Sequence, residues 1–207
     1  MEVHNVSSTF NKDWYSDKAK IIKQDENFMI IDQGKGIVTS YTLFDGIQLS
    51  FLDFDTDISM PSQKFNPNII SITHCRSGRY ECEYANHTVS YLPEGYFSVT
   101  GTQHLPVSFS FPLKKYYGLS LVIDKQSLSE EIKKMMETIP LNLDKIGSTL
   151  GIENNGYLSS TPPKLHHLFS ELYEALNIEQ LGYFKIKAIE LLYHIDQLTK
   201  NHVCDFK

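Results

Sequence analysis

The stretch "SITHCRSGRYECEYANHTVSYLPEGYFSVTGTQH", residues Ser71 to His104, decides the fold, because its alternation of side chains predicts short β-strands. Apolar and polar residues alternate over much of its length, and this period of two is that of a strand with one buried face. The same stretch contains two of the three cysteines, three of the eight histidines and a Pro-x-Gly sequence. It therefore has to be considered both as part of a sheet and as a candidate metal or thiol site.

The alternation also predicts how the first strands of this stretch pair. We expect a hairpin whose turn is Arg76-Ser77-Gly78, with Gly78 in the left-handed conformation that makes a bulge. This register collects one face from Ile70, Ile72, His74, Tyr80, Cys82 and Tyr84. The other face would carry Thr73, Cys75, Arg79, Glu81 and Glu83. A second turn at Asn86-His87 extends the first face by two pairs, Tyr84 with Val89 and Cys82 with Tyr91.

This register separates the groups that a thiol or metal site would need. Cys75 and Cys82 fall on opposite faces, so they should not form a disulfide, and they lack Cys-x-x-Cys spacing. Metal-binding β-barrels often supply two histidines in a His-x-His pair and a carboxylate. Here the residues two positions before and after His74 are Ile72 and Arg76. We expect no metal, no cofactor and no catalytic residue. An inward His74 that is buried or contacts a ligand is the favoured interpretation.

The rest of the first part of the chain, from Phe28 to about Asp124, also has the pattern of strands. "SYTLFDGIQLSF" has Asp45-Gly46 between two apolar runs, which is typical of a tight hairpin. "PVSFSF" and "YGLSLVI" alternate apolar residues with small or polar ones, as half-buried strands do. About eight short strands separated by turn residues predict a sandwich or a barrel.

After Asp124 the hydrophobic period becomes helical. Ser127 or Ser129 is expected to cap a helix over "EEIKKMMETI", which Pro140 ends, and "NLDKIGSTLG" predicts a short helix. Two longer helices are predicted in "PKLHHLFSELYEAL" and "GYFKIKAIELLYHIDQLTKN", and their apolar stripes should make an antiparallel pair. The expected organisation is a β-barrel with an N-terminal arm over residues 1–124 and a helical dimerisation or linker segment over residues 125–207.

Composition narrows the class of protein. With 207 residues, of which 41% are hydrophobic and 12% aromatic, the chain can build a proper core without disulfides. The net charge of −6 argues against a broad nucleic-acid surface. The N-terminus lacks the pattern of a signal peptide, and no apolar run approaches the ~18 residues of a membrane span. We therefore expect a cytoplasmic protein without a membrane partner.

Several of these motifs together resemble a known family. "LPEGYFSV" followed by His104 is similar to the second hairpin of cupins, and "HCRSGRYECEYANHTVSYL" resembles the N-terminal sensory domains of bacterial AraC-type (arabinose-operon-regulator) transcription factors. Two later segments, "FPLKKYYGLSLVID" and "HHLFSELYEALNIEQLGYFKIKAIELLYHIDQL", look similar to the next segments of those proteins, particularly in a subgroup from low-GC Gram-positive bacteria. The resemblance covers about residues 60 to 200.

The resemblance implies a mainly β fold with α: a cupin-like barrel (double-stranded β-helix, or jelly roll) that holds an effector, then helices that dimerise. In that family two helix-turn-helix motifs come next in the chain and bind DNA. Only seven residues follow Lys200 here. We therefore expect the sensor and dimerisation part of such a regulator, which would reach DNA only through an absent C-terminal helix-turn-helix domain.

Three hypotheses about function arise from these features. In the first, a small-molecule effector binds inside the barrel against His74, Tyr80, Cys82, Tyr84, Tyr91, His104 and Phe109. Its alternative is a barrel filled by its own side chains, without a ligand. The second is a metal-dependent cupin enzyme, which the missing His-x-His pair disfavours. The third is a scaffold for a homodimer, in which the last helix meets a second copy through Phe184, Ala188, Leu191, Leu192 and Ile195.

Overall fold

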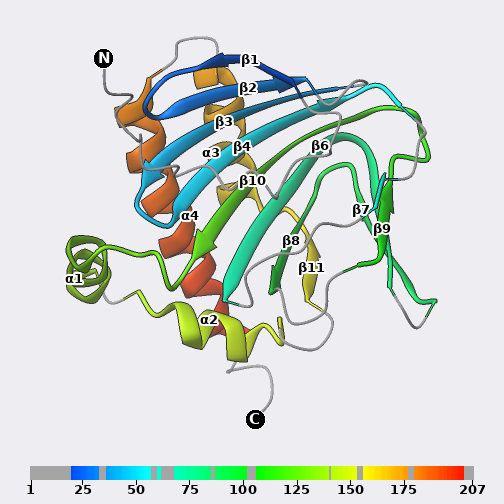
Figure 1. The fold of residues 1–207 in the computed structure, drawn as a ribbon. Coiled ribbons are helices and arrows are strands. Elements are labelled where there is room, and N and C mark those ends of the chain that lie inside the picture. Colours follow the sequence, from blue (N-terminus) through cyan, green and yellow to red (C-terminus); the bar gives the residue numbers. More distant parts are fainter. Residues whose placement is uncertain are drawn as a thin grey trace, which may run out of the picture.

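The computed structural model of the chain describes residues 20–32, 36–56, 60–61, 68–84, 87–101, 106–139, 141–152, 156–176 and 180–202, which form eleven strands and four helices (Figure 1). The strands are β1 (Lys20–Gln24), β2 (Phe28–Asp32), β3 (Gly36–Phe44), β4 (Ile47–Phe54), β5 (Met60–Pro61), β6 (Ile69–Glu83), β7 (Val89–Pro93), β8 (Tyr96–Gly101), β9 (Ser108–Ser110), β10 (Tyr116–Asp124) and β11 (Tyr157–Ser160). The helices are α1 (Glu130–Thr138), α2 (Leu143–Thr149), α3 (Pro163–Ala175) and α4 (Leu181–His202).

Nested antiparallel pairs organise the strands from β4 to β10. β4 pairs with β10, and β5 pairs with β9. The long strand β6 pairs with β8 along its first half and with β7 along its second half. Side by side, these pairs give the order β4-β10-β6-β8 in a large sheet and β5-β9-β6-β7 in a small one. This is the strand order of a jelly roll, or double-stranded β-helix, so the predicted mainly β, cupin-like fold with helices is confirmed.

The large sheet is extended at both edges. β3, β2 and β1 continue it beyond β4, and β11 adds a strand beyond β8. β11 lies within the predicted helical segment, and sequence reasoning missed it. The large hydrophobic core draws residues from the strands and from all four helices, so the two predicted segments share one core.

The predicted hairpin at Arg76-Ser77-Gly78 is wrong, because β6 runs through these residues without turning back. Gly78 is left-handed as predicted, with a φ of 86°. Its effect is a bulge within one strand: Cys75 and Ser77 pair with consecutive residues of β10, so Arg76 is an extra residue. Because β6 is continuous, it can pair with strands of both sheets, which a hairpin at this place would prevent.

The bulge reverses the side-chain alternation along β6, because one extra residue moves all later side chains to the opposite face. His74, before the bulge, therefore packs with the large core, whereas Tyr80, after it, packs with Cys75 in a second cluster on the other side of the sheet. Cys75 was expected on the polar face and is instead fully buried. Cys75 and Cys82 are both free, but the prediction that they fall on opposite faces is wrong, because the bulge turns Tyr80 and Cys82 to the side on which Cys75 lies.

The second predicted register is displaced by one residue. Glu83, not Tyr84, pairs with Val89, and Glu81, not Cys82, pairs with Tyr91. The loop between β6 and β7 is closed by a backbone bond from Tyr84 N–H to the Thr88 carbonyl, at 2.9 Å. The longer loop shifts every later pair by one residue, so Tyr91 lies on the solvent-exposed side of the small sheet.

Two predicted glycine turns are present. Gly46, with a φ of 76°, closes the hairpin between β3 and β4 after Asp45. Gly95, also at 76°, follows Pro93 and Glu94 between β7 and β8. These two strands pair with different halves of β6, so this turn carries the chain from the small sheet to the large one and makes no hairpin.

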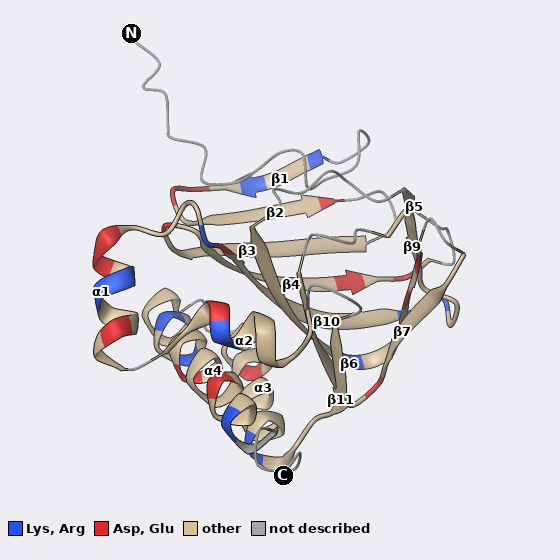
Figure 2. Ribbon diagram, turned by 90° about the horizontal axis from the view of Figure 1, so that it is seen from below, with Lys and Arg blue, Asp and Glu red and all other residues tan. Residues whose placement is uncertain are grey.

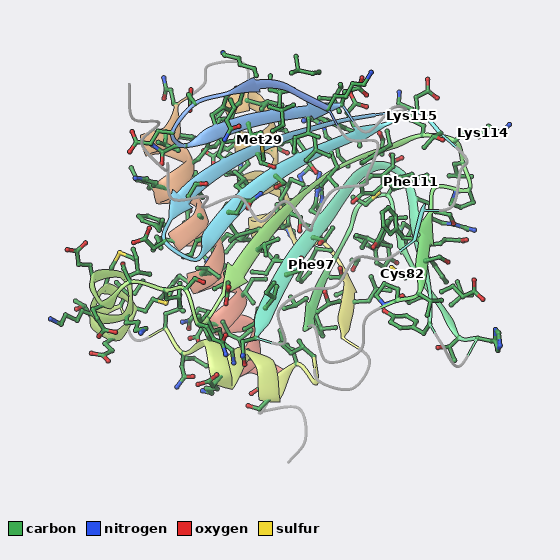
Figure 3. All side chains as sticks on the ribbon, viewed as in Figure 1. Met29, Cys82, Phe97, Phe111, Lys114 and Lys115 are labelled. Atoms are coloured by element: carbon green, nitrogen blue, oxygen red, sulfur yellow. The ribbon has the colours of Figure 1, made fainter. Side chains whose placement is uncertain are left out.

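The large sheet has a different layer on each face. α3 and α4 lie on one side, and β7 and β9 lie on the other (Figure 1). We call the side toward the helices the outer face and the side toward the small sheet the inner face. Alternate residues of β10 confirm the predicted amphipathic pattern, since Leu119, Leu121 and Ile123 are buried in the core on the outer face. Figure 3 shows Phe97 on the large sheet and Cys82 and Phe111 at the small-sheet end.

The predicted helices are confirmed, and of the two residues expected to cap the first of them Ser129 does so. Ser129 begins α1 and accepts a hydrogen bond from the Ile132 N–H at 3.4 Å. Asn142 begins α2 and accepts one from the Lys145 N–H at 2.8 Å. Pro140, predicted to end the first helix, lies outside the described residues. None of the helices in the described part combines the length and hydropathy that crossing a bilayer requires.

The five residues predicted to contact a second copy are buried inside the chain itself. Phe184, Ala188, Leu191, Leu192 and Ile195 are each at most 1% exposed. The Phe184 ring packs 4.8 Å from Tyr41 and 5.7 Å from Phe51, measured between centroids. The apolar stripe of α4 is wider than α3 alone can cover, and the sheet covers the remainder. That interface prediction is therefore corrected, and the exposed apolar residues of α4 are Ile186 and Tyr193.

The bulge glycine predicts a large difference between two substitutions. A Cβ at Gly78 would collide with the backbone carbonyl of Lys115, whereas a Cβ at Gly95 meets no atom within 4 Å. Both have positive φ, so both should carry the conformational cost of about 1 kcal/mol. Gly78→Ala should lower the free energy of unfolding by about 2 kcal/mol more than Gly95→Ala, as measured by urea denaturation. Equal losses would contradict the collision.

The corrected role of α4 gives a second prediction. Leu191→Ala should lower the free energy of unfolding by about 3 kcal/mol, because it leaves a cavity between α4 and the sheet. Glu174→Ala, at an exposed position of α3, should change it by less than about 0.5 kcal/mol. The loss for Leu191→Ala should not depend on protein concentration. A concentration-dependent loss would return this residue to an interface between copies.

Candidate functional site

A row of hydroxyl side chains crosses the inner face of the large sheet. Five neighbouring strands, β3, β4, β10, β6 and β8, each contribute one residue at the same register position. These residues are Ser40, Ser50, Ser120, Thr73 and Ser98. Directly opposed side chains in such a sheet lie on the same face, about 5 Å apart.

The residues that lie one position further along the same face are also mostly hydroxyls. Thr42, Ser71 and Thr100 extend the row, together with the amide of Gln48. We call the whole set the hydroxyl band: Ser40, Thr42, Gln48, Ser50, Ser71, Thr73, Ser98, Thr100 and Ser120. A jelly roll usually fills its inner face with apolar side chains, so a continuous polar band there requires an explanation.

The part of the band on β3 and β4 is deeply buried. The Ser40 and Ser50 hydroxyls lie 2.8 Å apart, and the Gln48 amide donates to the Ser50 hydroxyl at 3.2 Å. The hydroxyl of Thr42, also buried, has no hydrogen-bond partner among the described residues. A buried hydroxyl without a partner costs free energy, which a ligand or water could recover.

The part of the band on β6 and β10 is half-buried and connected. The Ser120 hydroxyl lies 2.9 Å from that of Ser71 and 3.1 Å from that of Thr73. The Ser71 and Thr73 hydroxyls are 3.3 Å apart. Each hydroxyl has one proton and two acceptor lone pairs, so this triangle leaves capacity for a further partner.

The band begins where an apolar cluster ends. Toward the small sheet the inner face carries the second hydrophobic cluster, made of Val38, Phe54, Cys75, Leu92, Phe111 and Tyr116. On β3, β4, β10 and β6 the inner face changes from apolar to hydroxyl in the same direction. The small sheet is therefore packed onto one end of the inner face, and the hydroxyl band lies beyond it, with Val122 among its hydroxyls.

Gly118 brings a phenol to this boundary. Its missing side chain lets the Tyr116 ring lie along β10, since a Cβ at Gly118 would collide with the Tyr116 hydroxyl. Ser120 follows two residues later on the same face. Burial raises the pKa of Tyr116 well above its usual value, so its hydroxyl stays protonated beside the band.

The depth of the band changes across the sheet. Ser40 on β3 is fully buried, whereas Leu158, the inner-face residue of β11 opposite Ser98, is 46% exposed. The hydroxyls on β10, β6 and β8 are intermediate. The band is thus closed at β3 and accessible from the β8–β11 edge.

The inner face of the large sheet carries no charge between its strand ends, within the part of the chain that the structure describes. Asp124, at the end of β10, is held in a turn and accepts from the Gln126 N–H and the Ser127 hydroxyl. The middle of β3, β4 and β10 is accordingly free of blue and red in Figure 2. The described residues also contain no group of three or more metal-ligating side chains.

On the outer face, β6 contacts α3 through His74. Its ring stacks on Phe169 with centroids 4.2 Å apart, and its Nδ1 lies 3.0 Å from the Tyr173 hydroxyl. The same hydroxyl donates to the His74 carbonyl at 3.3 Å. A phenol has one proton, so with that proton on the carbonyl, Nδ1–H donates to the phenol oxygen. His74 therefore fixes α3 to the strand that carries Thr73.

His74 is held in its neutral form. It is 5% exposed, and its Nε2 has no hydrogen-bond partner in the described part of the structure. Burial, together with the nearby positive charges of His166 and Arg76, lowers its pKa from 6.5 to about 4. Arg76, the bulge residue, covers the Tyr173 ring at 4.7 Å from its centroid. This cluster is a structural joint between strand and helix rather than part of the inner face.

The predicted lining residues do not form one site. Tyr80 and Phe109 lie in or against the apolar cluster, with ring centroids 5.9 Å apart, and Cys82 is buried beside them. Burial raises the pKa of the Cys75 thiol to about 12 and that of Cys82 to about 11, so neither thiol is reactive at neutral pH.

The other predicted lining residues are dispersed. His74 is on the outer face, and Tyr84 is half-buried near the β6–β7 loop, where its hydroxyl accepts from Ser90 at 3.4 Å. Tyr91 is 53% exposed, with Arg79 above its ring. His104 lies outside the described residues. Sequence reasoning assigned all of them to one face because it lacked the bulge.

Sequence reasoning missed the hydroxyl band, although a signal was present. "SYTLF", "IQLSF", "SITH" and "GLSLV" each place serine or threonine between buried apolar residues at the period of a strand. Each pattern alone indicates a half-buried strand with a solvated face. Only the register between strands shows that all these residues share one face, turned toward the inside.

No protein-family model matches the chain, and no curated protein matches it. Among solved structures, an HTH_3 family transcriptional regulator from Vibrio cholerae is 14% identical over 42% of this chain and 50% of that chain, with a TM-score of 0.35. The cupin_2 domain of an XRE family regulator from Enterobacter cloacae is 11% identical over 43% of this chain and 95% of its own, with a TM-score of 0.37.

ToxT from Vibrio cholerae is 10% identical over 74% of this chain and 57% of its own, with a TM-score of 0.47. The similarity thus spans about half the length of the two Vibrio cholerae proteins. It is distant in all three cases, and the assignment of the fold rests on the strand order of this chain.

The low pKa of His74 predicts a pH dependence of stability. Between pH 6.5 and about 4 the unfolded chain binds a proton at this group and the folded chain does not. The free energy of unfolding should therefore fall as the pH is lowered through this window, by up to about 3 kcal/mol. His74→Asn should remove this part of the pH dependence in urea denaturation, whereas His167→Asn, at an exposed histidine of α3, should retain it. The same pH profile in wild type and His74→Asn would contradict the assignment.

Proposed function

We propose that this chain is the effector-sensing and dimerisation domain of an AraC-type transcription regulator, and that it binds a small molecule on the hydroxyl band. The observation that supports it most is the band itself, an uncharged polar surface inside a jelly roll that is accessible from one edge. Small-molecule sites combine apolar walls with a few placed polar groups, and the band with the apolar cluster at its border has both. The resemblance of the sequence to AraC-type sensory domains supports the same assignment.

The chemistry of the inner face favours binding over catalysis. The hydroxyls of the band have no carboxylate or imidazole beside them that could act as a base, among the residues that the structure describes. The two buried thiols have raised pKa values; Cys75 lies in the apolar cluster, and Cys82 is buried beside Tyr80. The alternative of a metal-dependent cupin enzyme gains no support from these residues.

Strand β6 supplies a route from the band to the helices. Thr73 carries a hydroxyl of the band, and the next residue, His74, is hydrogen-bonded and stacked to α3. A ligand that moves or stiffens β6 would therefore change how α3 and α4 pack on the outer face. In the proposed regulator, α4 would carry that change toward the DNA-binding domain, which the resemblance places after it.

The proposed homodimer would use the exposed side of α4. Ile186 and Tyr193 are seven residues apart there and exposed, and Ile189 between them is half-buried. This spacing places the three on one side of the helix. The proposed setting is the bacterial cytoplasm, with no membrane partner and with DNA contacted only through the helix-turn-helix domain.

A thermal-shift screen with small metabolites tests the proposed function. At a concentration about 100 times its Kd, a ligand should raise the Tm of the wild-type chain by about 5 °C or more. Thr73→Val keeps the shape of the side chain and removes its hydroxyl, so it should abolish the shift. The control, Ser148→Ala, removes an exposed hydroxyl on α2 and should leave the shift unchanged.

Hydrogen exchange separates binding from coupling. The ligand should slow exchange in α3, and Tyr173→Phe should retain binding and lose that protection, because the phenol is the polar link to His74. No stabilising compound at all would favour a packed dimerisation scaffold and contradict sensing. An equal shift in wild type and Thr73→Val would place the ligand elsewhere.

A further inference from the structure

We propose that the α2 segment, residues 141–152, is a releasable clamp on the C-terminal half of α4. α3 contacts one flank of α4, β3 meets its N-terminal half at Phe184, and α2 contacts it near its C-terminal end (Figure 1). The clamp belongs to the helices of the outer face and needs no ligand on the hydroxyl band, so it goes beyond the proposed function.

Asp196 places a negative charge at the contact between α4 and α2. It is 1% exposed, and Leu192 and Thr199, which share its side of the helix, are fully buried as well. Lys187, which binds Glu171 of α3, precedes Asp196 by about two and a half turns and therefore lies on the opposite side of α4. Asp196 thus points away from α3 and toward α2 on the other flank.

The carboxylate of Asp196 is poorly satisfied at this place. Neither of its oxygens has a hydrogen-bond partner among the described residues. The Lys200 ammonium lies 2.9 Å from Oδ2 and balances the charge as an ion pair, without the alignment of a hydrogen bond. The Thr199 hydroxyl donates to the backbone carbonyl of Asp196 and not to its side chain. Burial of such a carboxylate costs free energy, which water recovers once α2 moves away.

Few polar contacts hold α2 in place against this cost. In the described part of the chain its backbone hydrogen bonds run within the segment or to Met136 of α1, and Asn142 caps its own helix. An ion pair from Lys125 to the exposed Asp144, at 2.8 Å, links it to the turn after β10, and such surface pairs add little stability. The helix has seven residues, with Gly147 among them, so it depends on apolar packing against the rest of the molecule.

Release of the clamp frees one flank of α4. It uncovers the apolar side of α2, which carries Leu143 and Ile146, and the side of α4 that carries Leu192 and Asp196. The contacts of α4 with α3 and with the sheet remain. The clamp therefore sets how firmly the last turns of α4 are held, because the apolar contact favours docking and the buried charge favours release.

Amide hydrogen exchange of the whole chain, followed residue by residue by NMR, tests the clamp. The amides of Ile146 and Leu150, which donate hydrogen bonds within the α2 segment, should exchange at least about a hundred-fold faster than those of β10. Asp196→Leu removes the buried charge at similar volume and should slow exchange in α2 by about ten-fold or more. Lys200→Met removes the counter-ion and should accelerate it by a similar factor. Lys164→Met, at an exposed lysine of α3, should leave it unchanged.

The response to Asp196→Leu decides the outcome. Fast exchange in α2 that this variant slows supports the clamp. Exchange in α2 as slow as in β10 overturns it, because α2 then does not open. Exchange that Asp196→Leu leaves unchanged or accelerates also overturns it, because opening then does not hydrate an unfavourable charge. Asp196→Asn, which keeps the shape of the side chain, gives the same comparison if Asp196→Leu fails to fold. Failure of the clamp leaves the sensing function standing, since none of these results requires a ligand.

Discussion

The left-handed backbone at Gly78 is the constraint on which both sheets depend. β10 passes so close to this point that a side chain would collide with the Lys115 carbonyl. The extra residue of the bulge, Arg76, lets β6 leave the large sheet and continue in the small one. One uninterrupted strand thus links the two sheets of the jelly roll, and the bulge sets the direction of every side chain after it.

The same strand connects the two faces of the molecule. Before the bulge, its odd residues, Ser71 and Thr73, belong to the hydroxyl band, and the even residue His74 joins α3. Thr73 and His74 are consecutive residues, so the contact with the band and the contact with α3 lie one residue apart along β6. The hydroxyl band and the helical layer are therefore joined by the shortest connection that a sheet permits.

The local signals in the sequence predicted the elements well. The Asp45-Gly46 turn, the cap at Ser129 and the apolar stripes of the last two helices are properties of a few neighbouring residues, and all are present. The site was predicted poorly. His74 and Tyr80 are separated by an even number of residues but lie on opposite faces, because the bulge lies between them. Nothing local distinguishes a left-handed glycine in a turn from one in a bulge, so the sequence did not predict this. The hydroxyl band consists of ordinary strand residues, each unremarkable in its own segment.

The resemblance to cupin-like sensory domains implied the jelly roll, whereas the sequence pattern by itself determined most of the strands, turns and helices and a sandwich or barrel followed by helices. Those features depend on periods of two and 3.6 residues and on the backbone preferences of single residues. The tertiary structure alone decided which side chains meet: that the stripe of α4 is covered by the sheet, that Cys75 is buried, and that hydroxyls from five strands form one band. These depend on the register between strands far apart in the chain. The one extra residue in β6 shifts that register and reverses the side-chain alternation after it.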